Sequence, residues 1–196
     1  MVNDARERIL VATLDLIGEH GIGGLSNRLV ARAAEVSLGT LTYHFPSQDD
    51  LLAHALEAFV DGEVARLEAL TEALEGTELS FDQALRVVRE IIEDQAGRRA
   101  QIAQFELNLQ ATRNRDLAAA SARCYAAYDR VGTAALHAIG VPDAERVAPM
   151  LAAMVDGLEL RRLAIGEGPS LDEAIGRFLA GPGGDQADGG PSTRRT

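Results

Sequence analysis

Apolar residues recur along most of the chain three and four positions apart, which is the period of amphipathic α-helices. Gly, Pro and Ser interrupt this pattern at intervals and separate about nine helical segments. The period-two runs of Val, Ile and aromatic residues that are typical of strands are absent from the sequence. The pattern therefore predicts an all-α protein, with helices at about residues 4–20, 27–34, 38–44, 47–74, 80–96, 98–112, 116–139, 143–165 and 170–180.

Residues 26–45 are predicted to form two short helices joined by a tight turn. Ser26 and Ser37 precede the two helices, where a hydroxyl can cap free backbone N–H groups. Leu41 and Phe45, four positions apart, are expected to face inward. The polar or aromatic side chains left on the other faces are Thr40, Thr42, Tyr43 and His44. This is the helix-turn-helix arrangement, which places its second helix in the major groove of DNA.

The same part of the chain contains a series of short motifs: RERIL at 6–10, GIG at 21–23, VS at 36–37, GTL at 39–41, YHF at 43–45 and LL at 51–52. On these motifs, residues 6–60 resemble the N-terminal domain of the tetracycline-repressor (TetR) family of bacterial transcription regulators. The chain departs from the family pattern at three positions. Glu35 stands where the turn usually has Gly, Thr42 where an aromatic residue is common, and Gln48 where a Lys usually begins the fourth helix.

Candidate DNA contacts lie on and beside the second short helix. Arg28 and Thr40 are expected near bases or adjacent phosphates, and Thr42 against a thymine methyl group or a base edge. Tyr43 and His44 are expected at phosphates. The remaining candidates are Asn27, Ser37, Leu38, Gly39, Ser47 and Gln48, of which Asn27 and the start of the fourth helix would hold the flanking strand.

The net charge of −11 argues at first sight against nucleic acid. Residues 1–47 contain four Arg and five acidic residues and so carry only −1, which leaves −10 in the rest of the chain. All 19 basic residues are Arg, whose paired donors match phosphate and guanine. A small number of basic residues in an acidic protein predicts weak non-specific binding to DNA and a strong dependence of that binding on salt.

The pattern suggests three regions: a helix-turn-helix DNA-binding domain at 1–47, a helical bundle for ligand binding and dimerisation at 48–180, and a disordered tail rich in Gly, Pro and Asp at 181–196. The helix at 47–74 would link the two domains. The last two helices are apolar on more than one face, which predicts packing against a second copy. The resemblance also implies a homodimer, which would present two recognition helices to palindromic double-stranded DNA.

A mixture of polar and apolar residues in the bundle predicts a pocket for a small-molecule effector of unknown identity. The candidate ligand contacts are Phe81, Gln101, Gln104, Phe105, Asn108, Leu109, Tyr125, Tyr128, Met150 and Met154. The same Phe and Met residues at helical spacing could equally fill a core. The leading hypothesis is a repressor released from DNA when a small apolar or amphipathic ligand shifts the helix at 47–74.

Two alternatives remain open from the sequence. One is a TetR-like dimer that acts without a small ligand, as an activator or under the control of a partner protein. The other is a helical dimerisation protein that has lost DNA binding. A bundle without a cavity would favour the first, and failure to bind the DNA upstream of its own gene would favour the second.

The sequence offers no enzyme signature. There is no Ser–His–Asp set, Gly-rich phosphate loop or suitably spaced carboxylate pair, so no catalytic residue is expected. The single cysteine, Cys124, excludes an internal disulfide and a Cys-based metal site, and the four His are isolated, so neither metal nor cofactor is expected. No apolar run approaches the roughly 20 residues of a membrane span. We therefore expect no membrane partner and a cytoplasmic location.

Two breaks carry local predictions. The glycines at 21, 23 and 24 are expected to form a loose loop after the first helix. Pro149 falls early in the helix at 143–165, so that helix is expected either to bend there or to begin late.

Overall fold

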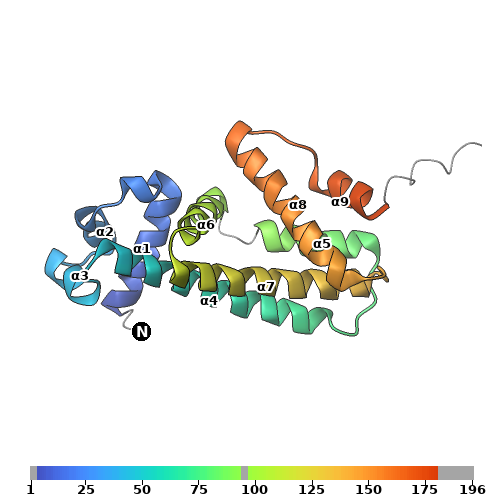
Figure 1. Ribbon diagram of the computed structural model, residues 1–196, viewed down its shortest axis with the longest axis horizontal. Coiled ribbons are helices and arrows are strands. Elements are labelled where there is room, and N and C mark those ends of the chain that lie inside the picture. Colours follow the sequence, from blue (N-terminus) through green and yellow to red (C-terminus); the bar gives the residue numbers. More distant parts are fainter. Residues whose placement is uncertain (1–3, 94–96, 181–196) are drawn as a thin grey trace, which may run out of the picture. The chain divides into compact units, whose positions relative to one another are not determined.

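The computed structural model describes residues 4–93 and 97–180, and the regular elements within these ranges are all helical (Figure 1). They are α1 (Ala5–His20), the 3-10 helix η1 (Ile22–Gly24), α2 (Asn27–Ala33), α3 (Leu38–His44), α4 (Gln48–Leu74), α5 (Phe81–Glu93), α6 (Gly97–Ala111), α7 (Arg115–Ala138), α8 (Ala144–Ile165) and α9 (Leu171–Ala180). The predicted all-α class is confirmed. The predicted tail at 181–196 lies outside the described residues.

The chain divides into two compact units, residues 1–149 and residues 150–196. The first unit contains α1 to α7 and the first residues of α8, and the second contains the rest of α8 together with α9. The predicted division into a DNA-binding domain and a bundle at residue 47 stays a prediction.

Serine side chains set the starts of the three helices around the predicted recognition element. In each case the hydroxyl of the N-cap residue accepts a hydrogen bond from the N–H three residues later: 3.3 Å at Ser26, 2.9 Å at Ser37 and 3.1 Å at Ser47. Each bond satisfies one of the donors that a helix start leaves free. The predicted caps at these three positions are confirmed.

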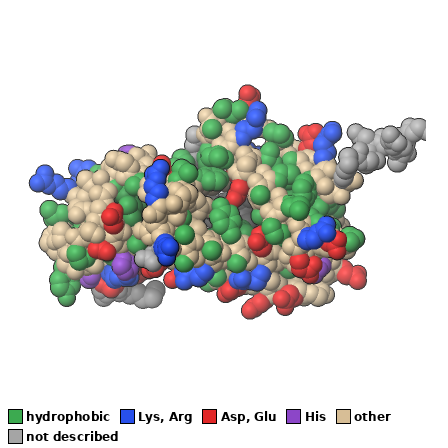
Figure 2. Space-filling view, in the orientation of Figure 1, with side chains coloured by type: hydrophobic (Ala, Val, Ile, Leu, Met, Phe, Trp, Pro, Cys, Tyr) green, Lys and Arg blue, Asp and Glu red, His purple; other side chains and the backbone are tan. Residues whose placement is uncertain are grey.

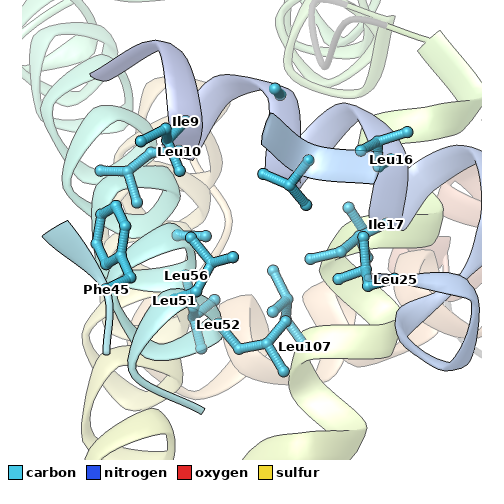
Figure 3. Close-up of a cluster of buried hydrophobic side chains, with 14 of the residues drawn as sticks. Ile9, Leu10, Leu16, Ile17, Leu25, Phe45, Leu51, Leu52, Leu56 and Leu107 are labelled. Carbon is cyan, nitrogen blue, oxygen red and sulfur yellow. The ribbon is translucent and has the colours of Figure 1, made fainter. Parts of the chain in front are cut away.

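One hydrophobic core runs through the first unit, from the helix-turn-helix into the bundle (Figure 3). Leu41 and Phe45 are 0% and 1% exposed, as predicted, and they anchor α3 against α1 and α2. Leu107 of α6 and Cys124 of α7 belong to the same cluster. Because packed interiors transmit displacement, the recognition helix is mechanically continuous with α6 and α7.

Helices α4 and α7 pack side by side and run in the same direction. Arg123 of α7 pairs with Asp61 of α4 at 2.9 Å, and Arg130 pairs with Glu68 at 3.0 Å. The paired residues advance by seven on both helices, which only a parallel arrangement allows. Each pair is exposed and contributes less than about 1 kcal/mol, so the buried contacts hold the two helices together.

Two local predictions need correction. The segment after α1 is the 3-10 helix η1 instead of a loose loop, with Leu25 N–H bonded to the Ile22 carbonyl at 3.2 Å. Helix α8 already begins at Ala144 and continues through Pro149. Pro149 therefore does not delay the start of the helix, and the other predicted outcome, a bend at this position, stays a prediction.

Candidate DNA interface and effector cavity

The candidate DNA contacts lie together on α2, α3 and the start of α4, at one end of the first unit (Figure 1). None of the eleven is buried. Tyr43 is 83% exposed, which is unusual for an aromatic side chain, and its ring meets the ring of His44 edge-on at 5.3 Å. The structure therefore leaves these residues accessible at one end of the first unit, and their contacts with DNA stay a prediction.

The threonine hydroxyl groups of α3 are already hydrogen-bonded within the helix or to its N-cap. The Thr40 hydroxyl lies 2.8 Å from the Ser37 hydroxyl, which also accepts a hydrogen bond from the Thr40 N–H. Thr42 donates its hydroxyl to the carbonyls of Leu38 and Gly39 at 3.1 and 3.2 Å. With its hydroxyl directed at the backbone, the group that Thr42 can offer to a base is its methyl, which suits a thymine methyl group.

Glu35 adopts a left-handed backbone conformation in the turn between α2 and α3, with φ of +54°. Its N–H bonds to the Arg32 carbonyl at 3.2 Å, and the Val36 N–H bonds to the Ala31 carbonyl at 3.0 Å. These are the two bonds of a Schellman motif, in which the residue at this place is usually Gly. The turn thus has the geometry that glycine favours, although the chain supplies a glutamate.

Two arginines of α1 contact the helix-turn-helix at the end of α2 and at Phe45. The Arg8 side chain donates from Nε to the carbonyl of Ala34 at 3.2 Å, beyond the last residue of α2. A cation at this place satisfies a free carbonyl and suits the negative end of the helix dipole. The Arg6 guanidinium lies 5.6 Å from the centre of the Phe45 ring, a cation–π distance.

Most acidic side chains lie away from the candidate DNA interface, whereas Glu35, Asp49 and Asp50 are exposed beside it. Figure 2 shows basic side chains at the end formed by α2 and α3, and acidic ones along the C-terminal half of α4. Asp61 follows Gln48 by 13 residues, which is about 20 Å of helix. This exceeds two Debye lengths at physiological salt, so most of the protein's negative charge is screened from bound DNA.

The start of α4 is more acidic than a phosphate contact would favour. Ser47 donates its hydroxyl to Asp50 Oδ2 at 2.7 Å and caps the Asp50 N–H, and Asp49 is exposed beside it. The two carboxylates suit the positive end of the helix dipole, but they oppose a DNA phosphate at the same place. Gln48, exposed between them and the cap, adds no compensating charge.

A small cavity lies between α4, α6 and α7, with a volume of about 10 Å³. This is close to the space that a single water molecule requires. Aromatic, aliphatic and small polar side chains form its wall: Leu56, Phe59, Val60, Gln104, Asn108, Ser121, Cys124, Tyr125 and Tyr128.

A buried carboxylate lies behind one wall of the cavity. The Tyr128 hydroxyl donates to Glu63 Oε1 at 2.6 Å, and Arg66 holds both oxygens of Glu63 at 2.6 and 3.1 Å. Burial, together with the Glu63 carboxylate, raises the pKa of Tyr128 far above its usual range. Tyr128 therefore stays a hydrogen-bond donor at every physiological pH.

Asn108 ties α6 to α7 on the cavity side. Its amide donates to the Tyr125 hydroxyl at 3.1 Å, and its carbonyl accepts from the Ser121 hydroxyl at 3.1 Å. The cavity is thus closed by polar contacts that a bound molecule would have to replace.

Four of the predicted ligand contacts meet at this cavity: Gln104, Asn108, Tyr125 and Tyr128. Gln101, Phe105, Phe81 and Leu109 are not in its wall, and the last two are 39% and 64% exposed. Met150 and Met154 lie in the second unit, and their role stays a prediction.

Sequence reasoning missed the contribution of α4 to the cavity. Phe59 and Glu63 occupy the same apolar stripe of α4 as Leu56 and Leu67, at helical spacing. An acidic residue within such a stripe is the signal that could have located the site, because a carboxylate is rarely buried without a specific partner.

Two negative findings hold for the described part of the chain. No group of three or more His, Cys, Asp or Glu side chains there is placed to hold a metal ion. No helix there is long and apolar enough to cross a membrane.

Comparisons with known proteins agree with these features. Residues 9–55 match the model for bacterial regulatory proteins of the tetR family, and residues 79–181 match the model for the tetracyclin repressor-like C-terminal domain. The chain is 44% identical over 52 residues to the HTH-type transcriptional regulator PksA of Bacillus subtilis, and 45% identical over 53 residues to the repressor KstR of Rhodococcus jostii. The first match covers 26% of this chain and 25% of PksA, and the second 27% and 25% of KstR. The chain thus spans less than half the length of the curated relatives it matches.

Solved structures match over most of the chain. The multidrug binding protein EbrR in complex with ethidium is 31% identical with a TM-score of 0.66, and the match covers 87% of this chain and 94% of EbrR. EbrR in complex with imidazole is 30% identical with a TM-score of 0.64, over 89% and 93%. A transcriptional regulator from Saccharomonospora viridis in complex with choline is 26% identical with a TM-score of 0.68, also over 89% and 93%.

Proposed function

Since the chain belongs to the TetR family of bacterial transcription regulators, we propose that it is a repressor which an amphipathic cation releases from its operator. Two copies would present their α3 helices to successive major grooves of a palindromic operator, about 34–36 Å apart. The proposal includes a cytoplasmic location, where the bacterial chromosome lies.

The observation that carries the effector half of this proposal is the cavity between α4, α6 and α7. Phe59, Tyr125 and Tyr128 give it aromatic walls, and ring faces attract cations. The Glu63 carboxylate lies one hydrogen bond behind Tyr128 and accepts from its hydroxyl, while the ion pair with Arg66 offsets its charge, so the attraction for a cation would come from the rings. EbrR binds ethidium and the Saccharomonospora viridis regulator binds choline, and both ligands carry a quaternary nitrogen.

Release of DNA would follow because an effector must displace helices in order to enter so small a cavity. At about 10 Å³ it admits no organic cation, so an effector binds only after α6 or α7 moves away from α4. Only three residues separate the end of α3 from the start of α4, so a displacement of α4 would move the recognition helix. The effector weakens DNA binding to the extent that it prefers the opened state.

The dimer would be formed by α8 and α9. Met150, Leu160 and Ile165 of α8 are 58%, 51% and 56% exposed in a single chain. Large apolar side chains along one helix are typical of a surface that another protein covers. Light scattering of Leu160→Glu against wild type tests this, with Glu167→Gln as an exposed control. A variant that stays as large as wild type would argue against this interface.

The DNA half is tested with the intergenic DNA upstream of the protein's own gene, by fluorescence anisotropy. Tyr43→Ala should weaken binding about fivefold, the effect of losing one phosphate contact, while the exposed position leaves folding unchanged. Tyr43→Phe separates the hydroxyl from the ring. Unchanged affinity in Tyr43→Ala would reject the assignment of this residue.

The effector half is tested with choline, because ethidium intercalates into DNA and would disturb the assay directly. Saturating choline should lower operator affinity at least tenfold. The control is the uncharged carbon analogue of choline, in which a tert-butyl group replaces the trimethylammonium group, and it should have little effect. Equal responses to both compounds would mean that the cavity selects shape and not charge.

The alternatives give different outcomes in the same assays. A regulator controlled by a partner protein would bind the operator but ignore choline. A dimerisation protein without DNA binding would fail in the anisotropy assay, and Tyr43→Ala would then change nothing.

A further inference from the structure

Glu106 of α6 reaches the connection between α1 and α2, 84 residues earlier in the chain. Its Oε2 atom lies 3.5 Å from the backbone nitrogen of Ile22, the first residue of η1. Gly21 has φ of +68°, and a Cβ built on it would lie 3.2 Å from Glu106 Oε1. The carboxylate therefore sits directly on the Gly21–Ile22 backbone, where a larger residue at position 21 would displace it.

Helix α6 presents two adjacent faces, one to the cavity and one to the core that it shares with α1. Gln104 and Asn108, four residues apart, line the cavity. Ala103 and Leu107, also four apart, are buried in the core cluster that contains Ile17 of α1 (Figure 3 shows Leu107). Glu106 adjoins this second face. A change at the cavity therefore reaches Glu106 through less than one turn of one rigid helix.

The connection that Glu106 touches leads directly into α2. Ile22 accepts the Leu25 N–H at 3.2 Å, Leu25 is buried, and Ser26 is the N-cap of α2. Four residues thus separate the contact from the helix that supports α3. Gly24 and Leu25 each donate a backbone hydrogen bond within this connection, to Gly21 and Ile22, so a displacement at Ile22 can be passed on towards Ser26.

We infer that Glu106 is a positioning residue for the DNA-binding helices, which links the state of the cavity to the start of α2 through α6. This route is additional to the movement of α4. The inference rests on the proposed function only in assigning the opening of the cavity to an effector. The proposed link between Asn108 and Ile22 through Glu106 needs no ligand, so it is tested first in the free protein.

The test is a double-mutant cycle read by amide hydrogen exchange at residues 22–25 in the free protein. Asn108→Ala removes both ties of α6 to α7 and should raise exchange about two- to fivefold, the range for one weak hydrogen bond. Glu106→Ala should raise it similarly. The double variant should exchange no faster than Glu106→Ala, because the link is already cut. Glu106→Gln, which keeps an acceptor oxygen, should stay near wild type.

Two results would overturn the inference: exchange at residues 22–25 that does not respond to Asn108→Ala, or effects of the two substitutions that multiply. Equal midpoints of urea unfolding for all variants would show that the fold is intact. If Glu106→Ala unfolds early, the comparison of Glu106→Gln with Asn108→Ala decides the matter, since Gln should preserve the response to Asn108.

A second measurement uses choline and the upstream DNA. Glu106→Ala should bind choline within twofold of wild type, yet lose at least half of the choline-induced change in operator affinity. A full response in Glu106→Ala would argue against the link. If wild type ignores choline, the proposed effector is wrong, while the exchange experiment still decides the role of Glu106.

Discussion

Replacing Glu35 by Gly should stabilise the protein, although it deletes a side chain. A non-glycine residue in the left-handed region costs about 1–2 kcal/mol, and Glu35 has φ of +54°. Replacing Glu35 by Gly relieves this strain, but glycine loses more conformational freedom on folding, which offsets about 0.5–1 kcal/mol of the stabilisation. Glu35 is exposed, so no packing is lost. The net gain is about 0.5–1 kcal/mol, which corresponds to roughly 1–4 °C in the unfolding temperature.

Glu35→Ala is the matched control, because it removes the same charge but keeps the Cβ atom that causes the strain. Its stability should lie within about 0.5 kcal/mol of wild type. Both variants remove a carboxylate beside α3, so both should bind operator DNA more tightly at low salt. Thermal unfolding reports the backbone effect, and DNA affinity reports the charge. If Ala stabilises as much as Gly, the reasoning about backbone strain is wrong.

The protein contains the same motif with its usual residue, which supplies an internal reference. After α7, Gly140 has φ of +75° and bonds to the His137 carbonyl at 2.9 Å, while Val141 bonds to the Leu136 carbonyl at 2.9 Å. A Cβ on Gly140 would meet nothing within 4 Å, so Gly140→Ala introduces backbone strain alone. It should destabilise by about 1 kcal/mol. A neutral Gly140→Ala would refute the value used for Glu35.

Three further substitutions test other parts of the structure. Gln48→Lys should tighten operator binding and steepen the dependence of log affinity on log salt by about 0.9 per protomer, and an unchanged slope would mean that residue 48 meets no phosphate. Tyr128→Phe removes the hydroxyl that donates to Glu63, a carboxylate 8% exposed that keeps its bonds from Arg66, and should cost about 1–3 kcal/mol in urea unfolding, against little for the more exposed Tyr125→Phe; equal losses would contradict the role of this hydrogen bond. Burial raises the pKa of Asp129 above its value in the unfolded chain, so the folded state loses stability as pH rises through the folded pKa. Asp129→Asn should therefore stabilise at pH 7, and this gain should vanish in acid; a gain that persists at low pH would exclude ionisation as its cause.

The helix-turn-helix was predictable because its signals are local. Ser26, Ser37 and Ser47 each cap the N–H three residues later, and Leu41 and Phe45 are buried as their spacing indicates. A cap or an amphipathic stripe depends on residues within one or two turns, which the sequence places next to one another. The conformation of Glu35 is also local, but glutamate itself does not indicate it, and the only sign is that the resembling family usually has Gly at this place.

The effector cavity was predicted only in part, because it depends on which faces of distant helices meet. Asn108 and Tyr125 were expected at the site, and they are joined by a hydrogen bond across 17 residues. Phe59 and Glu63 come from α4, whose pairing with α7 is parallel and cannot be read from the periodicity of either helix. The contact of Glu106 with Ile22 has the same origin, since it joins residues 84 positions apart.

The closed cavity and the shared core together constrain how regulation can work. In the state described, the space between α4, α6 and α7 holds no more than one water molecule, so an effector binds only the fraction of molecules that is open. Its apparent affinity is its intrinsic affinity reduced by that fraction. Operator DNA that favours the closed state lowers the fraction further, and by reciprocity the effector lowers operator affinity by the same factor. Contacts that resist opening, such as those of Asn108, would therefore set the sensitivity of the proposed repressor as directly as the groups that touch its effector would.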